Sequence, residues 1–398
     1  MSKTKGAASR KRDLRARRIN VKVDDMKYKR MPIEIESPEQ LGYDTIECNL
    51  TESSYTDFKF KELGLKLDDL VIAYIDHRGH PGLRKLLSED TDGKIRPDEI
   101  LLTAGAASAL FIIATTLLSK GDELVVIRPN YATNLETPRA IEATLKIVEL
   151  NFENGWKISP SEIEAAITPK TKLVSITVPH NPTGAMTSAA DVRAIVEITR
   201  KAGCFLLVDE TYREMSFDGV LPYAATLSDH VISVASFSKT FGLPGIRMGW
   251  LMTKNTSLFE QFFAAKEQIQ ICGSALDEEI AFQFYQRKGE FLPKILVNLR
   301  RRFEIVRSFM NSQKFLEWVE PKGGCVAFPR FRADIRERLD LEKFYKTLNH
   351  EFSTHVGPGH WFEQEKHSMR IGYGWPDDEQ LKKGLSNIVK AVEFSLKN

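Results

Sequence analysis

Between about residues 98 and 255, short apolar segments alternate with longer segments of helical pattern. The apolar segments are rich in β-branched residues without a polar face, and the clearest of them cover residues 99–105, 122–129, 172–178, 205–210 and 230–237. Strands buried on both sides have this pattern, because helices cover both faces of a parallel sheet. The sequence therefore predicts an α/β fold with a mostly parallel sheet.

The chain of 398 residues is long enough for two or three packed domains. After residue 255 the pattern is mostly helical up to about residue 311, and a smaller α+β unit closes the chain. We expect a basic arm at 1–30, an N-terminal segment at 31–70 that packs with the small domain, a large domain at 71–290 and a small domain at 291–398.

The first thirty residues carry most of the charge asymmetry. They hold twelve Lys and Arg against three Asp, a net charge of +9, so the remainder carries −7 of the total of +2. This composition predicts a solvated, disordered arm. A transit peptide and a weak tether to a polyanion remain alternatives, whereas the apolar core of a secretory signal is missing. We predict no nucleic-acid partner.

The remaining composition indicates an intracellular protein. The longest apolar run, Ala106 to Leu118, is interrupted by polar residues and too short to cross a bilayer, so no membrane partner is expected. Four cysteines lie far apart without a CxxC pair. That spacing favours reduced thiols, no metal site and a cytoplasmic location, with organellar targeting by the basic arm still open.

Three motifs follow directly after predicted strands. They are "PHNPTG" after 172–178, "DETY" after 205–208 and "SFSK" after 231–235. In an open α/β sheet, ligands bind at the carboxyl ends of the strands. We therefore expect the three motifs to line one pocket.

The third motif places Lys239 at the end of a strand between packed segments. Burial lowers the pKa of a lysine from about 10.4 and makes its amine a nucleophile toward carbonyl groups, as a Schiff base requires. A lysine that merely extends into solvent at a strand end is the alternative from this motif alone. The neighbouring residues decide between the two.

Those neighbours indicate an anion site. Arg247 and the hydroxyl groups of Ser236 and Ser238 lie close in sequence to Lys239, while the helix that opens at Gly105 offers free amide groups. A nucleophilic lysine beside a phosphate site suits an aldehyde cofactor with a phosphate handle, which is pyridoxal 5′-phosphate (PLP).

Further residues meet the other needs of that cofactor. Asp209 can pair with the protonated ring nitrogen on which the electron sink depends. Tyr212 and Asn181 can hydrogen-bond the phenolic oxygen, and Tyr131 can stack on the ring. Each residue alone is weak evidence, but together they form a complementary set.

These motifs, together with Arg370 in "SMRIGYG" and Tyr74 in "YIDHRGH", resemble the class I/II aminotransferases of fold type I over residues 45–395. The resemblance implies a large domain with a seven-stranded sheet and a smaller α+β domain, and an amino group moved from an L-amino acid to a 2-oxo acid. It also implies that Lys239 is the Schiff-base lysine and that the ring is contacted by Asp209, Asn181, Tyr212 and Tyr131. The phosphate would be bound by Gly105, Ala106, Ala107, Ser236, Ser238 and Arg247. Arg370 would bind the substrate carboxylate, and Tyr74 would reach the partner's phosphate in a homodimer with shared sites.

Two departures from the family pattern bear on the substrate. The segment "NLTESSYTDF" lacks the glycine and proline that many relatives carry there, and His180 replaces a common asparagine. The second variant and the C-terminal motifs resemble the capreomycidine synthase-like branch, which acts on an arginine derivative. Glu52, Asp76 and His77 lie in segments expected to cover the substrate, so Glu52 or Asp76 can favour a cationic amino acid. Ordinary polar residues on surface loops are the alternative.

Other classes of function can be weighed from the same residues. A lyase, decarboxylase, oxidase or cyclase can use the same cofactor-binding residues, because orientation selects the bond at Cα that breaks. A cofactor-binding sensor fused to a DNA-binding head is disfavoured, since the arm is short and lacks a helix-turn-helix pattern. A nicotinamide dehydrogenase is disfavoured because "GPGHWF" lacks the third glycine and the strand–helix context.

Overall fold

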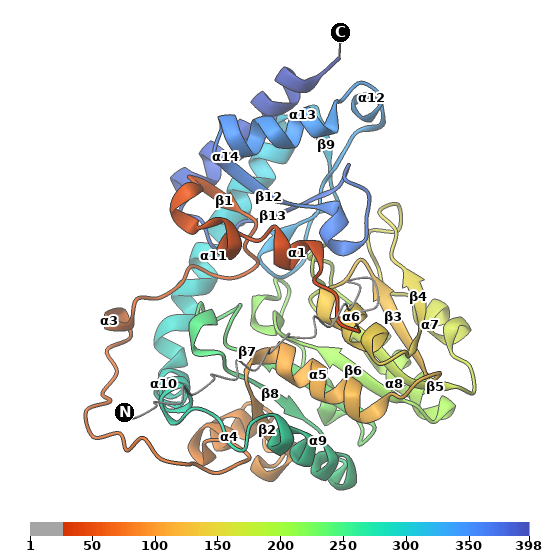
Figure 1. Ribbon diagram of the computed structural model, residues 1–398, viewed down its shortest axis with the longest axis vertical. Helices are drawn as coiled ribbons and strands as arrows, with labels where there is room; N and C mark the ends of the chain where they lie inside the picture. Colours follow the sequence, from red (N-terminus) through yellow and green to blue (C-terminus); the bar gives the residue numbers. More distant parts are fainter. Residues whose placement is uncertain (1–26, 398) are drawn as a thin grey trace, which may run out of the picture.

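The computed structural model describes residues 27–397. Figure 1 shows a large sheet flanked by helices in the lower part of the view and a smaller unit above it. The large sheet has seven strands in the order β2-β8-β7-β6-β5-β3-β4. Their bounds, in chain order, are β2 Ile100–Thr103, β3 Glu123–Arg128, β4 Thr144–Glu149, β5 Thr171–Thr177, β6 Phe205–Asp209, β7 Val231–Ser236 and β8 Gly249–Met252. The α/β prediction with a seven-stranded sheet is confirmed.

Strand direction decides which loops can meet. Strands β3 to β7 run parallel to one another, while β8 is antiparallel to both β7 and β2. Two reversals leave β2 pointing the same way as β7. The carboxyl ends of β2, β5, β6 and β7 therefore lie at one edge, so the helix that follows β2 begins beside the loops that follow the other three.

Helices cover both faces of this sheet. Helices α5 (Gly105–Leu117) and α9 (Thr256–Ile269) pack on one face through Ile112, Ile113 and Phe262. The opposite face is covered by α7 (Pro160–Ala166) and α8 (Ala189–Ala202), and farther along by α4 (Pro81–Glu89) and α10 (Ala275–Gln286). Helix α6 (Ala132–Ala140) links β3 to β4.

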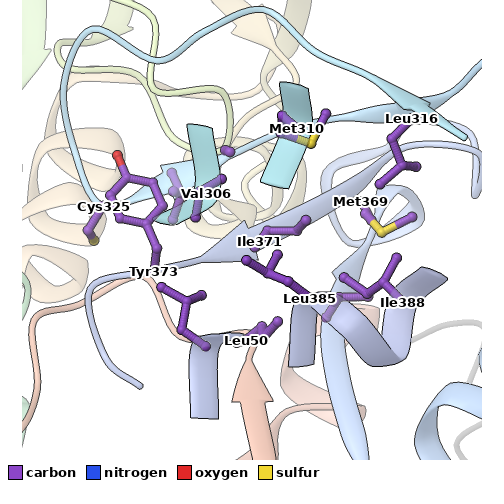
Figure 2. Close-up of a cluster of buried hydrophobic side chains, with 14 of the residues drawn as sticks. Leu50, Val306, Met310, Leu316, Cys325, Met369, Ile371, Tyr373, Leu385 and Ile388 are labelled. Atoms are coloured by element: carbon purple, nitrogen blue, oxygen red, sulfur yellow. The ribbon is translucent and has the colours of Figure 1, made fainter. Parts of the chain in front are cut away.

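The smaller unit is built on a four-stranded sheet of order β1-β12-β13-β10. Its elements are β1 Cys48–Leu50, β10 Val326–Ala327, β12 Thr354–Pro358 and β13 Met369–Gly372, with the separate pair β9 Leu316–Glu317 and β11 Arg330–Phe331. Helices α11 (Lys288–Ser312), α12 (Ala333–Arg336), α13 (Leu341–Lys346) and α14 (Asp378–Ser395) complete it. Figure 2 shows its core, where Leu50, Ile371 and Leu385 meet.

The N-terminal segment crosses between the two units. It contains α1 (Pro32–Ile35), α2 (Pro38–Leu41) and α3 (Phe60–Leu63), and β1 pairs in parallel with β12 of the small unit. Helix α11 runs across position 290, so the proposed domain limits at 70 and 290 stay predictions. The predicted disordered arm falls almost wholly on residues 1–26, outside the described residues.

Five strands follow the sequence pattern and two do not. Strand β4 lies at the sheet edge, where Thr144 and Glu149 are exposed and only Val148 is buried, so its sequence lacks the continuous apolar pattern of a strand buried on both sides. Strand β8 has only four residues and begins with Gly249. None of the helices within residues 27–397 is both long and apolar enough to cross a membrane.

Candidate active site

A cavity of about 550 Å³ opens at the edge where β2, β5, β6 and β7 end. Its walls include most of the predicted site residues: Ala106, Ala107, Tyr131, Asn181, Asp209, Tyr212, Ser236, Ser238, Lys239, Arg247, Arg370 and Glu52. The expectation that the strand-end motifs share one pocket is met by this arrangement. A cavity of this size can hold a cofactor and a small substrate together.

Lys239 lies in the loop after β7, and packing holds that loop in place. The preceding Phe237 is fully buried among aromatic rings that include Trp250 and Tyr285. The Lys239 carbonyl accepts a hydrogen bond from the Tyr55 amide at 2.8 Å. Burial lowers the pKa of the Lys239 amine. The amine therefore becomes a free nucleophile at a lower pH than an ordinary lysine.

Gly242 lies where another segment of the chain approaches the lysine loop closely. Its φ of +60° and an added Cβ only 2.4 Å from the Thr56 carbonyl oxygen leave room for hydrogen alone. The N-terminal segment therefore closes over the lysine loop, and the Phe58 amide bonds the Gly242 carbonyl at 3.2 Å. The glycine admits a chain segment here, not a ligand, and Gly245 faces open space.

Asp209 is the last residue of β6 and is 6% exposed. One carboxylate oxygen accepts bonds from the Thr211 amide at 3.1 Å and the Thr211 hydroxyl at 2.6 Å. Burial raises the pKa of Asp209, and the bonds from Thr211 oppose that rise. A buried carboxylate that already faces two donors is oriented to receive a cationic partner from the cavity.

The N-terminus of α5 faces the cavity without a side-chain cap. Gly105 adopts φ +77°, and an added Cβ would lie 2.7 Å from Nη2 of Arg247. Arg247 also donates to the Ser238 hydroxyl at 3.4 Å. Free amides, a guanidinium and the buried hydroxyl groups of Ser236 and Ser238 therefore surround one space, which suits a phosphate group.

Arg370 lies on β13 and is 4% exposed. Its Nη1 donates to Oδ1 of Asn181 at 3.1 Å and its Nη2 donates to the Thr51 carbonyl at 2.6 Å. The Phe362 ring lies 4.9 Å from the guanidinium carbon. Nε of Arg370 has no hydrogen-bond partner among the described residues. This buried guanidinium retains capacity for a carboxylate in the cavity.

Two tyrosines complete the predicted set. Tyr131 stands before α6 and lines the cavity, and Tyr212 is buried with its ring in the same wall. Burial raises the pKa of both phenols. Both therefore stay protonated at neutral pH and can donate hydrogen bonds.

Three residues of the segment 74–77 do not line the cavity within this chain. The Tyr74 side chain is 83% exposed. Asp76 pairs with Arg84 at 2.7 Å, and Nδ1 of His77 lies 2.6 Å from Glu267. The suggestion that Asp76 contacts the substrate side chain therefore has no support within one chain, because Arg84 already neutralises its charge.

His180 serves the fold and lies outside the cavity wall. Its Nε2 donates to the Pro129 carbonyl at 3.0 Å, and its Nδ1 lies 2.7 Å from the Thr183 hydroxyl. Burial lowers the pKa of His180 to about 4. The residue that distinguishes the "PHNPTG" loop thus ties that loop to β3 as a neutral imidazole.

We expect His180 to make the protein less stable in mild acid. Its pKa is 6.5 when unfolded and about 4 when folded, so stability is lost as the pH falls from 6.5 toward 4. At pH 5 the loss is about 2 kcal/mol. Urea unfolding at pH 7 and pH 5 measures it, and His180→Asn should remove most of the difference. Equal losses in the two proteins would contradict this role.

Several cavity residues carry no sequence signal of their own. Thr177 and Thr211 flank Asp209, and the buried Thr177 hydroxyl has no hydrogen-bond partner among the described residues. Tyr43 and Asp57 come from the N-terminal segment. The threonines could have been suspected from their positions at strand ends, whereas only the folded chain brings Tyr43 and Asp57 to the cavity.

The chain matches the family model for aminotransferase class I and II over residues 49–388 and belongs to that family. It is 25% identical over 340 residues to an aspartate aminotransferase of Sulfurisphaera tokodaii, a match that covers 82% of this chain and 84% of the relative. It is 28% identical over 302 residues to a capreomycidine synthase of Streptomyces vinaceus, covering 74% and 75%. The resemblance drawn from the motifs is confirmed.

The structure agrees with this assignment. A PLP-dependent aminotransferase from Streptococcus suis superposes with a TM-score of 0.85 at 25% identity, covering 94% of this chain and all of the other. The protein is therefore a PLP-dependent aminotransferase of fold type I. The residues present fit the cofactor. The N-terminus of α5 has no side-chain cap, Gly105 leaves no room for a Cβ beside Arg247, and the Thr177 hydroxyl has no hydrogen-bond partner among the described residues.

Proposed function

We propose that this protein transfers the amino group of an L-amino acid to a 2-oxo acid, with Lys239 as the residue that binds PLP covalently. One observation carries this proposal: the amine of Lys239 shares its cavity with the buried carboxylate of Asp209 and the buried guanidinium of Arg370. These three groups match a ring aldehyde, a ring nitrogen and a substrate carboxylate, respectively.

PLP, when bound, supplies an aldehyde that captures amino groups and a ring that accepts the electrons of a bond broken at Cα. Asp209 would hold the proton on the ring nitrogen through an ion pair, because its second carboxylate oxygen is free of the Thr211 bonds. Asn181 and Tyr212 would donate hydrogen bonds to the phenolic oxygen. Tyr131 would pack on the ring face.

The phosphate would bind where three kinds of donor converge. The amides of Gly105, Ala106 and Ala107 point out of the first turn of α5. Arg247 supplies the positive charge, and its guanidinium lies so close to Gly105 that one phosphate can bond both. Ser236 and Ser238 would add hydroxyl donors.

Lys239 would also move the proton. With the cofactor bound, the amine of Lys239 would lie tethered over the site, where it could take a proton from the substrate Cα and return it elsewhere on the same face. Its lowered pKa supports the first half of that task, because at any given pH a desolvated amine is more often unprotonated than an ordinary lysine and so is free to accept a proton. Proximity supplies the rest of its effect.

Arg370 would bind the substrate carboxylate. Its planar guanidinium is fixed by Asn181, Thr51 and Phe362, so little side-chain entropy is lost on binding. The same grip suits the carboxylates of the amino acid and of the 2-oxo acid, as a two-substrate exchange requires.

We further propose a homodimer in which Tyr74 reaches the partner's phosphate site. Exposed apolar side chains are concentrated in two segments, the extended segment before α4 and the region from the end of α9 to the start of α10: Val71, Ile72, Tyr74, Ile269, Ile271 and Leu276. Concentrated apolar exposure supports an interface with a partner. The cytoplasm remains the predicted location.

A lyase or cyclase is the second candidate. The similarity to a capreomycidine synthase over 302 residues favours it. The residues that bind the cofactor would be the same in both cases, so the net reaction must be measured.

The purified holoenzyme should lose its PLP absorbance on mixing with its amino acid and regain it with a 2-oxo acid. Mass spectrometry would detect pyridoxamine phosphate, and its formation without release of ammonia would establish transamination. Release of ammonia, carbon dioxide or a cyclised product with PLP regenerated unaided would instead establish the second candidate.

A further inference from the structure

One wall of the active-site cavity comes from the N-terminal segment, and its charge is negative. Between residues 30 and 57 the cavity lining includes four carboxylates and one guanidinium: Glu34, Glu39, Glu52, Asp57 and Arg30. The positive groups elsewhere in the lining, Lys239, Arg247 and Arg370, lie at the cofactor and carboxylate ends. The wall that remains for a substrate side chain is therefore acidic.

Of these four acidic residues, Glu52 is next in sequence to a residue that contacts Arg370. The preceding residue, Thr51, accepts a bond from Nη2 of Arg370 through its carbonyl. Gly372 allows this close approach, because an added Cβ would lie 1.8 Å from the Glu52 carbonyl oxygen. The side-chain hydrogen bond of Glu52 comes from the Tyr43 hydroxyl at 2.9 Å. Arg370 thus contacts the backbone of this segment and leaves the Glu52 carboxylate available.

Aromatic rings connect Glu52 to a second carboxylate. The rings of Tyr43 and Trp375 stack with centroids 5.8 Å apart and an interplanar angle of 22°. Nε1 of Trp375 donates to Oδ2 of Asp57 at 2.8 Å. Two carboxylates and two stacked rings are thus linked by hydrogen bonds and stacking, and three of the four residues line the cavity.

A ligand group in this cavity is indicated independently by Arg370. Its side chain is more than nine-tenths buried, lines the same cavity, and leaves Nε without a hydrogen-bond partner among the described residues. A substrate whose carboxylate binds to Arg370 has its α-carbon fixed beside that end of the cavity. The substrate side chain must then extend along the remaining walls, one of which carries Glu52.

We propose that Tyr43, Glu52 and Asp57 select amino acids whose side chain ends in a cation, with Trp375 as the residue that positions Asp57. This inference rests on the proposed aminotransferase function and adds the class of its amino donor. Carboxylates attract a guanidinium or ammonium group directly, and the faces of Tyr43 and Trp375 attract it through their π-electrons.

Other side chains fit this wall less well. An apolar side chain would displace water from Glu52 and Asp57 without replacing its hydrogen bonds. An acidic side chain would face the same carboxylates, with Arg30 as its one cationic partner in this wall, and Nη2 of Arg30 already donates to the Glu34 carbonyl at 2.6 Å. Electrostatic complementarity therefore favours a cation.

The test compares substrates that differ in charge alone. L-arginine and its neutral isostere L-citrulline are mixed with the PLP holoenzyme, and the rate of cofactor conversion is followed in single turnovers, with L-aspartate and L-phenylalanine beside them. The wild-type protein should prefer arginine over citrulline by about tenfold to a hundredfold, the value of a charge-assisted hydrogen bond. Glu52→Gln should abolish most of that preference, because arginine turnover should fall far more than citrulline turnover.

A matched control and a positioning variant sharpen the result. Asp44→Asn removes one negative charge beside Tyr43 but outside the cavity lining, so the preference should persist. Trp375→Phe keeps a ring and removes the donor to Asp57, so it should reduce the preference without lowering citrulline turnover. Faster conversion by aspartate or phenylalanine, or equal arginine preference in wild type and Glu52→Gln, would overturn this inference alone. Failure of every amino acid to convert the cofactor would overturn the proposed function as well.

Discussion

Lys239→Ala should bind PLP yet lose at least about a thousandfold in turnover, because it removes both the nucleophile and the proton carrier. The phosphate site around Gly105 and Arg247 and the carboxylate of Asp209 are left intact, so the variant should still hold the cofactor without a covalent bond. Borohydride treatment followed by mass spectrometry should fix PLP to the wild-type chain at Lys239 and leave the variant unmodified.

The control for this variant is Lys254, which does not line the cavity. Its Nζ donates a hydrogen bond to the Thr226 carbonyl at 2.8 Å. Lys254→Ala should therefore keep both turnover and the covalent adduct. If Lys239→Ala retained the adduct or normal turnover, the assignment of Lys239 would be wrong.

Asp209→Asn should reduce turnover by about a hundredfold to a thousandfold, because an amide of the same shape cannot offset the positive charge of the ring nitrogen. Asparagine can still accept the bonds from the Thr211 amide and hydroxyl, so the fold around β6 should survive. Cofactor affinity should fall as well. Titrating the apoprotein with PLP and following its absorbance measures the affinity, and the rate of cofactor conversion by the amino acid measures the loss of turnover.

Asp229→Asn is the matched control. Asp229 precedes β7 and lies outside the cavity lining, so its loss should change neither PLP affinity nor turnover. Turnover of Asp209→Asn near the wild-type value would show that this carboxylate does not pair with the cofactor.

The cofactor-binding half of the site could be predicted from local sequence. Lys239 and Asn181 each follow a strand with a readable apolar pattern, Asp209 ends such a strand, and parallel strands bring their carboxyl ends to one edge. Gly105 belongs to the same logic, although its place beside β7 depends on the two reversals through β8. Periodicity and strand direction were sufficient there, because each position depends on its own strand.

The substrate half could not be predicted in the same way. Tyr43 and Trp375 are more than three hundred residues apart in sequence, yet their rings stack. The sequence does not distinguish the carboxylates of Asp76 and Glu52. In the structure, Arg84 neutralises Asp76, whereas Glu52 lines the cavity. No local pattern records such differences, because they arise from contacts between distant segments.

The sequence by itself determined the fold class and the family and supplied the residues that we propose bind the cofactor, because strand and helix periodicity and short motifs encode them locally. The tertiary structure alone decided that His180 is a buried structural link, that Gly242 admits the N-terminal segment, and that an acidic, aromatic wall lines the cavity. The physical reason is that charge pairing, burial and close approach depend on which distant residues meet, and only packing settles that.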